Sequence, residues 1–112
     1  MMSELAKKHC KPCEGKSDAL ESARIKELHQ ELNSGWELME DHHIEKEFRF
    51  DGYQPAVDFT NKVANLAKEE NHHPDILLSY GKVKVTLWTH KAGGLTENDF
   101  VLAAKIEERR QK

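Results

Sequence analysis

Apolar residues recur along this chain with two different spacings, and the changes between them predict the order of the secondary-structure elements. Three stretches repeat apolar side chains every three or four positions, which is typical of helices that bury one face. Four shorter stretches alternate apolar and polar residues, which is the period of a strand with one buried face. The predicted order is therefore helix, two strands, helix, two strands and helix.

Each predicted helix has its own start or stop signal. The first begins at Ser22, a residue that caps the free N–H groups of a first turn, and ends before Gly35. The second has Pro55 in its first turn and must end before Pro74, because a proline disfavours helical dihedrals in the residue before it. The third opens at Thr96. The apolar positions that these helices are expected to bury are Ile25, Leu28, Leu32, Ala56, Phe59, Val63, Leu66, Ala67, Phe100, Ala103, Ala104 and Ile106.

The predicted strands form two pairs, each joined by a hairpin-length connection. This order suits a four-stranded antiparallel sheet with helices packed on one face, which places the chain in the α+β class. The other sheet face would then lie open, and Trp36 or Phe48 is a candidate for a partner surface there, through which copies of the chain would associate symmetrically. The strands are expected at 36–39, 44–50, 76–80 and 83–87.

The length of 112 residues is enough for one domain with one modest core. Residues 1–17 mix Lys, Gly, Pro and Ser without periodicity, and we interpret them as a flexible N-terminal segment. The single domain is expected to cover residues 18–112, with a solvated end at 107–112.

Charge and hydropathy argue against two classes of partner. The chain has 17 Lys and Arg against 20 Asp and Glu, so it lacks the basic excess that neutralises nucleic-acid phosphates or anionic lipids. No apolar run approaches the roughly 20 residues of a membrane-spanning helix, and no hydrophobic region of a signal peptide follows Met1. We therefore expect no nucleic-acid partner, no membrane association and a cytoplasmic location.

The two cysteines lie in His9-Cys10-Lys11-Pro12-Cys13, a spacing found in half of a zinc site and in redox pairs. The chain has no second pair of this kind, and no strand-helix-strand pattern of a thioredoxin-like protein surrounds this one. We favour a reduced pair without a function of its own, and a zinc or redox role stays as the alternative.

Histidines give the strongest indication of chemistry. Asn71-His72-His73-Pro74 ends the second predicted helix, and His90 follows the last predicted strand. Imidazoles gain or lose a proton near neutral pH, so this set indicates acid/base catalysis. A zinc site of the same three histidines is the alternative, although adjacent residues seldom place both rings on one ion. The similar pair His42-His43 is a caution, because it lies in a predicted hairpin loop where nothing else indicates chemistry.

Asp99 allows two interpretations. It stands three residues after Thr96, so it fits the acid of a capping box that binds the backbone at the start of a helix. It also fits a carboxylate that faces a ligand or a histidine, because the helix N-terminus keeps it ionised. The spacing does not decide between these roles.

Together these motifs closely resemble the signature of pterin-4a-carbinolamine dehydratases. The similarity covers roughly residues 20–108, and the double histidine with the downstream Leu87-Trp88-Thr89-His90 is its most specific part. Gly94-Leu95-Thr96 with Asp99 and the Cys10-Lys11-Pro12-Cys13 head are also similar. Many members have Glu four residues before the first histidine, where this chain has Lys68. Glu69 cannot be assumed to replace it, because one position rotates a helical side chain by about 100°.

The resemblance implies a homodimer or homotetramer that dehydrates 4a-hydroxytetrahydropterin to quinonoid dihydropterin. That reaction recycles the pterin used by aromatic amino acid hydroxylases, and it uses no metal or cofactor. The resemblance also implies that His72 and His90 transfer protons, that His73 orients the pterin and that Asp99 supports the site. Among the motif residues, those expected to contact the substrate are Pro74, Trp88 and Thr89. Vertebrate relatives also serve as dimerisation cofactors of a homeodomain transcription factor, so a protein-binding module without catalysis is the alternative function.

Overall fold

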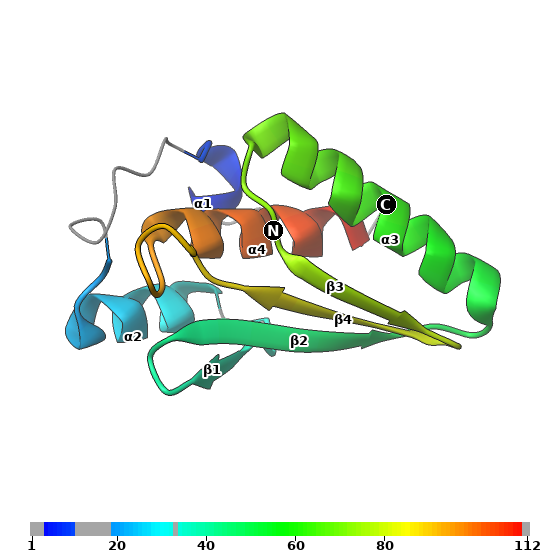
Figure 1. Ribbon diagram of the computed structural model, residues 1–112, viewed down its shortest axis with the longest axis horizontal. Coiled ribbons are helices and arrows are strands. Elements are labelled where there is room, and N and C mark those ends of the chain that lie inside the picture. Colours follow the sequence, from blue (N-terminus) through cyan, green and yellow to red (C-terminus); the bar gives the residue numbers. More distant parts are fainter. Residues whose placement is uncertain (1–3, 11–18, 33, 111–112) are drawn as a thin grey trace.

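The computed structural model describes residues 4–10, 19–32 and 34–110, and its elements follow the predicted order with one addition (Figure 1). Helices and strands alternate as expected, and a short helix precedes them. The elements are α1 Glu4–Lys7, α2 Ser22–Leu32, β1 Glu37–Met39, β2 His43–Arg49, α3 Tyr53–Glu70, β3 Asp75–Ser79, β4 Lys82–Leu87 and α4 Glu97–Arg110.

The four strands form one antiparallel sheet in the order β1-β2-β4-β3, which confirms the predicted α+β fold. Val83 of β4 pairs with Phe48 of β2 on one side and with Leu78 of β3 on the other. The turn between β3 and β4 contains Gly81 with a φ of 70°. A Cβ atom there would also lie 3.1 Å from the carbonyl oxygen of Phe50, so this turn needs glycine for its φ and for the close approach.

One face of the sheet carries the hydrophobic core. Apolar residues alternate with polar ones along β2 and β4, and those that point to the core are at most 1% exposed: Ile44, Phe48, Val83, Val85 and Leu87. The helix α3 packs on β3 and β4, and α4 contacts each of the other three helices. Burial of one such side chain contributes roughly 1.5–3 kcal/mol, so the alternation determines which sheet face the helices cover.

Trp36 and Phe48 do not belong to an open surface, so that prediction was wrong. Trp36 is 3% exposed and Phe48 is 1% exposed, and their ring centroids lie 5.9 Å apart inside the core. The open face of the sheet instead carries charged side chains such as Glu45 and Lys84, whose carboxylate and ammonium groups are 3.5 Å apart. The strand pairing decides this difference, because it places Phe48 beside Val83 and on the helix side.

The described part of the N-terminal segment also corrects a prediction. Residues 4–7 form α1, which packs against α4. Leu5 is fully buried, and Lys105 of α4 donates a hydrogen bond of 2.9 Å to the carbonyl oxygen of Ala6. Residues 4–10 are therefore not a free tail, and a pattern of two apolar residues was too short to show this. The rest of the predicted segment lies outside the described residues.

The helix α4 continues to Arg110, and residues 107–109 are only partly exposed, so of the predicted solvated end the described part bears out only Arg110. Lys46 binds the carboxylate of Glu107, and the guanidinium of Arg110 lies 5.2 Å from the centroid of the Phe48 ring. These contacts tie the last turn to the sheet, whereas residues 111–112 lie outside the described part. Within the described ranges, no helix has the length and apolar character needed to cross a bilayer.

Candidate active site

The end of α3 sets the positions of His72 and His73. Asn71 adopts a left-handed conformation with a φ of 52°, and its N–H bonds back to the carbonyl oxygen of Lys68. The N–H of His72 bonds to the carbonyl oxygen of Ala67 at 3.1 Å. This pair of bonds is a Schellman motif, which stops the helix within one residue. The chain therefore leaves the helix at Asn71 and continues through Pro74 into β3, and the helix ends before Pro74 as predicted.

The connection between β4 and α4 sets the position of His90. The N–H of Thr89 donates to the carbonyl oxygen of Gly94 at 2.9 Å, and the N–H of Gly93 donates back to Thr89 at 2.9 Å. These bonds close residues 89–94 into a compact loop. His90 is the first residue beyond Thr89, and its side chain is exposed. In Figure 1 this loop and the end of α3 lie at the same end of the molecule, beside the start of α4.

The side chain of Asp99 binds both of these segments. Its side chain is fully buried, and one carboxylate oxygen, Oδ1, lies 2.6 Å from Nε2 of His72. The other oxygen, Oδ2, accepts hydrogen bonds of 2.9 Å from the hydroxyl of Thr89 and from the N–H of Thr96. Asp99 therefore has both roles that the spacing left open, because each carboxylate oxygen serves one of them.

The donors around Asp99 determine which nitrogen of His72 carries a proton. An ionised carboxylate only accepts hydrogen bonds, so Nε2 of His72 is the donor, and Nδ1 of the neutral ring keeps its lone pair. The hydroxyl of Thr89 donates its hydrogen to Asp99. The hydroxyl of Thr96 therefore donates to the oxygen of Thr89 across 2.9 Å. Both oxygens of Asp99, the two threonine hydroxyls and Nε2–H of His72 have partners, and these bonds hold the His72 ring in one orientation.

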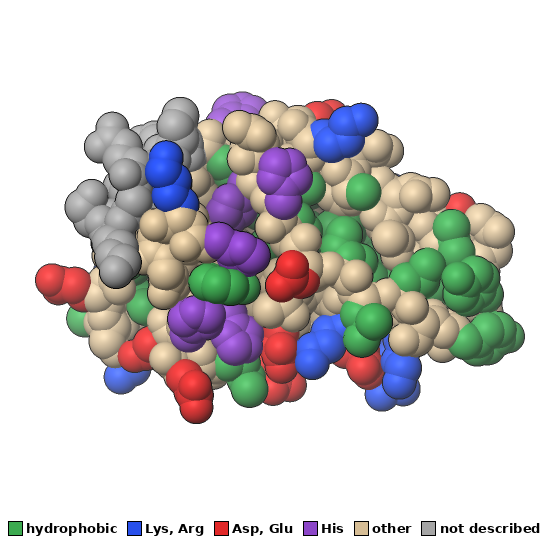
Figure 2. Space-filling model, in the orientation of Figure 1, with side chains coloured by type: hydrophobic (Ala, Val, Ile, Leu, Met, Phe, Trp, Pro, Cys, Tyr) green, Lys and Arg blue, Asp and Glu red, His purple; other side chains and the backbone are tan. Residues whose placement is uncertain are grey.

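An open cleft of about 740 Å³ lies over this network, between the end of α3 and the loop after β4. Six of the seven predicted site residues line it: His72, His73, Pro74, Trp88, Thr89 and His90. Asp99 lies beneath the cleft and reaches it through His72. Figure 2 shows that histidine side chains gather on this face of the molecule, near the same end. The structure therefore brings together the residues that the sequence separated.

Two of the predicted substrate-contacting residues are already engaged with other groups. The hydroxyl of Thr89 belongs to the Asp99 network, so Thr89 supports the site from below. The ring of Trp88 lies 3.9 Å from the ring of His90, centroid to centroid. Among the side chains that the structure describes, no group of three or more His, Cys, Asp and Glu is arranged to hold a metal ion, so the alternative zinc site gains no support.

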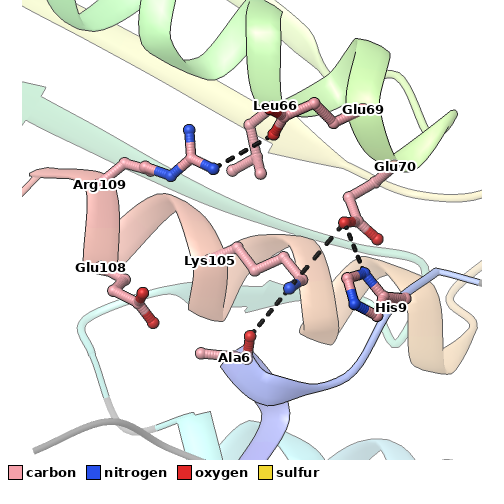
Figure 3. A pocket seen from close by; sticks show the side chains of 8 residues that line it. All are labelled: Ala6, His9, Leu66, Glu69, Glu70, Lys105, Glu108 and Arg109. Atoms are coloured by element: carbon pink, nitrogen blue, oxygen red, sulfur yellow. Dashed lines mark hydrogen bonds and ion pairs between the residues drawn. The ribbon is translucent and has the colours of Figure 1, made fainter.

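The cleft also has lining residues that were not predicted as site residues, and two of them, Cys10 and Glu70, connect it to the N-terminal segment. Glu70 accepts a hydrogen bond of 2.8 Å from the N–H of Cys10, and its other oxygen lies 3.0 Å from Nδ1 of His9. Figure 3 shows Glu70 and Lys105 from α3 and α4 pointing toward His9 and Ala6, beside a second cavity of about 380 Å³. The N-terminal segment is thus fastened to α3 and α4, and Cys10 becomes a wall of the larger cleft.

Burial and charge keep the thiol of Cys10 protonated. Desolvation, followed by the nearby carboxylates of Glu70 and Asp99, raises the pKa of Cys10 from 9.0 to about 12. The thiol lies 3.6 Å from the carbonyl oxygen of Asn98, to which it donates. Because the thiolate is the form that reacts and binds metals, these surroundings argue against a redox or zinc role for Cys10. Its partner in the motif, Cys13, lies outside the described residues.

We expect Cys10 to react slowly with thiol reagents. At pH 8 a thiol with a pKa near 12 is almost entirely protonated, so alkylation by iodoacetamide should be at least about 10-fold slower than that of an exposed cysteine. Peptide mass spectrometry at several times would measure the rate for Cys10 separately. Glu70→Gln should accelerate the reaction, and equal rates in both proteins would contradict this account of the thiol.

Glu70 should stabilise the fold in a pH-dependent way. Burial alone raises its pKa, but the hydrogen bonds from Cys10 and His9 and the charge of Lys105 lower the pKa of Glu70 below its ordinary value of 4.5. A carboxylate with a lowered pKa stabilises the folded state above pH 4.5, and this contribution disappears as the pH falls through its lower folded pKa. We expect Glu70→Gln to cost about 1 kcal/mol of unfolding free energy at pH 7.

Urea unfolding at pH 7 and at pH 3 would measure this cost. The difference between the wild type and Glu70→Gln should shrink at the lower pH, because protonated Glu70 resembles glutamine. Glu69→Gln is the matched control. Glu69 is the neighbour of Glu70 on α3, but its carboxylate is 60% exposed and pairs with Arg109 on the surface. A pH-independent difference would contradict the assignment.

The position four residues before His72 gives no acid to the cleft. Lys68 is exposed and does not line the cleft, and Glu69 directs its carboxylate to Arg109 at 3.2 Å. The next acid along α3, Glu70, holds the N-terminal segment. The caution about Glu69 therefore agrees with its surface ion pair.

Comparison with known proteins identifies the family of this chain. The sequence profile of the family described as Pterin 4 alpha carbinolamine dehydratase matches residues 18–109. A relative from Alkaliphilus metalliredigens that carries the family's name is 46% identical over 111 residues, which is 99% of this chain and 100% of the relative. Another from Rubrobacter xylanophilus is 47% identical over 106 residues, which is 95% of this chain and 98% of the relative.

Solved structures show the same fold. A Brucella melitensis protein described as a transcriptional coactivator/pterin dehydratase superposes with a TM-score of 0.73 and 31% identity, over 80% of this chain and 95% of that one. A pterin dehydratase-like protein identified as a RuBisCO assembly factor in the α-carboxysome gives a TM-score of 0.58 at 23% identity, over 70% of this chain and 93% of that one, which shows the fold alone. The family profile spans most of the chain and the relatives align over nearly all of it, so this protein belongs to the pterin 4 alpha carbinolamine dehydratase family.

Proposed function

We propose that this protein dehydrates a 4a-hydroxytetrahydropterin to the quinonoid dihydropterin and so recycles the pterin that aromatic amino acid hydroxylases consume. One observation carries the proposal: imidazoles from two separate segments, His72 and His90, line the same cleft, and a buried carboxylate holds one of them. The cleft of about 740 Å³ lies within the range of roughly 300–1,000 Å³ that is usual for small-molecule sites.

The reaction needs one proton removed and one proton delivered. The N5–H of the pterin loses its proton as the C4a–N5 double bond forms, and the 4a-hydroxyl leaves as water once it is protonated. In our proposal His72 accepts the N5 proton at Nδ1, because Asp99 holds Nε2–H and stabilises the imidazolium that results. His90 delivers a proton to the hydroxyl from the other side of the cleft. Together the two proton transfers release one water molecule from the substrate.

The remaining cleft residues bind and orient the pterin in this proposal. His73 lines the cleft beside His72 and is exposed, so its ring is free to reach the substrate. Pro74 and Thr89 also line the cleft. The proposed dehydration needs no metal and no organic cofactor, because the leaving group is water and side chains of this chain supply the acid and the base.

A direct assay tests the proposal. The carbinolamine is generated in the cuvette by a pterin-dependent hydroxylase, and formation of the quinonoid product is followed by absorbance with and without this protein. We expect the protein to accelerate the dehydration well beyond the spontaneous rate, and to do so after dialysis against a chelator. A rate equal to that of the protein-free solution would end the proposal.

A protein-binding module without catalysis is the second candidate. The names of the two solved neighbours mention coactivation and RuBisCO assembly for those proteins. The complete hydrogen-bond network around Asp99 favours catalysis here, since a binding surface has no need of an oriented imidazole. Inactivity in the assay together with a stoichiometric partner in a pull-down would favour the module. The homodimer or homotetramer and the cytoplasmic location stay predictions, the first of which light scattering would test.

A further inference from the structure

The turn between β1 and β2 has an unusual backbone that presents His42 to the rest of the molecule. Glu40 and Asp41 both have positive φ, 53° and 56°, a region that residues with a side chain rarely adopt. The N–H of His42 bonds to the carbonyl oxygen of Met39 at 2.9 Å, and the hydroxyl of Ser22 holds the carboxylate of Asp41 at 2.7 Å. Positive φ at both central residues is the conformation of a tight hairpin turn, so the turn fixes the place of His42 between β1 and β2.

The presented side chain joins a row of three rings. The centroid of the His42 ring lies 4.5 Å from that of Trp88, and the centroid of Trp88 lies 3.9 Å from that of His90. Trp88 and His90 line the cleft, whereas His42 contacts Trp88 from outside the cleft. The row therefore connects the turn between β1 and β2 to a proposed proton donor. In the sequence, 47 positions separate Asp41 of this turn from Trp88, and no pattern relates them.

His43 restrains the ring of His42. The Nδ1 atoms of the two histidines are 3.0 Å apart, so one donates a hydrogen bond and the other accepts it. Nε2 of His43 lies 3.9 Å from the carboxylate of Glu45, which in turn lies 3.5 Å from the ammonium group of Lys84. These contacts anchor His42 to the open face of the sheet and leave it little freedom to move away from Trp88.

The two proposed proton-transfer residues are held in different ways. His72 is held by a hydrogen bond to a buried carboxylate, and its side chain is only 11% exposed. His90 is exposed, and within the described ranges its ring has no hydrogen-bond or ion-pair partner, so its contact with Trp88 is what restrains it. A catalytic group that turns freely spends little time in the productive orientation, and the rate falls accordingly.

We propose that His42 is a positioning residue for His90 and acts through Trp88. The tilted ring contact with His42 fixes the indole, and the fixed indole holds the imidazole of His90 over the cleft. This inference rests on the proposed function only for its effect on rate, because the restraint on His90 exists in the free protein. It also assigns a role to the histidine pair that the sequence left without one.

Two variants of His42 test the inference. His42→Ala removes the ring, and His42→Phe keeps an aromatic ring but removes the hydrogen bond to His43. We expect His42→Ala to lower kcat about 3- to 10-fold, the usual effect of one lost aromatic contact, with KM nearly unchanged. His42→Phe should restore most of kcat. His29→Gln, which changes a histidine at a separate cavity, is the control and should have no effect.

A second measurement does not depend on catalysis. The imidazole resonances of His90, assigned by their loss in His90→Ala, are recorded in the free wild type and in both His42 variants. We expect His42→Ala to shift or broaden them and His42→Phe to restore them. Unchanged His90 resonances in His42→Ala would overturn the inference, as would a loss of activity that His42→Phe does not repair. If the wild type itself fails to accelerate dehydration, the proposed function falls, while these resonances still decide whether His42 positions His90.

Discussion

His90→Ala should lower the acceleration of dehydration by about 100-fold to 10,000-fold, the usual contribution of one positioned acid or base. His90 lies on the cleft and its side chain is exposed, so the substitution removes the proton donor without opening the core. The unfolding temperature should therefore stay within about a degree or two of the wild type, as for most surface substitutions. Stopped-flow absorbance under single-turnover conditions would measure the loss in the chemical step itself.

His29→Gln serves as the matched control for this variant too. His29 lies beside a different cavity, where its Nε2 binds the carbonyl oxygen of Trp36 at 2.6 Å, so activity should be unchanged. Retention of full activity in His90→Ala would exclude His90 as a proton donor. Loss of activity in both variants would mean that removal of any histidine disturbs the protein, and the assignment would fail.

Two substitutions at Asp99 should separate its structural role from its catalytic one. Asp99→Ala removes the acceptor for Thr96, Thr89 and His72 at once and leaves buried donors without partners. We expect a loss of about 3 kcal/mol of unfolding free energy together with most of the activity. Asp99→Asn keeps a carbonyl oxygen for the N–H of Thr96 and the hydroxyl of Thr89, so it should cost only about 1 kcal/mol.

The amide of Asp99→Asn should nevertheless disable His72. Its NH₂ group would face Nε2 and donate to it, so the ring proton would move to Nδ1, the atom that is proposed to accept the N5 proton. We expect kcat to fall about 100-fold with little change in KM, because a base in the wrong tautomer loses its contribution to the chemical step.

Glu97→Gln is the control for both Asp99 variants. It removes an acid from the same first turn of α4, and among the residues that the structure describes this acid pairs with the exposed Lys8 and Arg24. Its activity and its unfolding free energy should match those of the wild type. An active Asp99→Asn protein would show that the Asp99 carboxylate is a helix cap and nothing more.

Local patterns were sufficient to predict most of the fold. The spacing of Ala56, Phe59 and Val63 predicted α3, and the alternation of Val83, Val85 and Leu87 predicted β4, because helix and strand periodicity is a property of neighbouring residues. The stop before Pro74 was predictable for the same reason. The prediction of a flexible segment was wrong for α1, because its two apolar residues, Leu5 and Ala6, are too few to show a helical period.

The sequence was sufficient to propose the candidate site residues, but not to predict how they are arranged. The double histidine and the Thr89-His90 pair were recognisable by type and order, and all of them line one cleft. The assignment of Oδ1 and Oδ2 of Asp99 to different partners depends on how α3, α4 and the loop after β4 meet. Sequence spacing carries no information on how these elements pack together, so it left the role of Asp99 undecided.

Contacts between distant segments decided the remaining features. Trp36 and Phe48 became core residues, Cys10 became a wall of the cleft, and His42 came to lie against Trp88. Each of these outcomes depends on strand register or on helix packing, which is fixed by the combined burial of many side chains and not by the residues themselves. The chain thus encodes its elements and its chemistry locally, while the orientation of that chemistry arises only when the elements pack together.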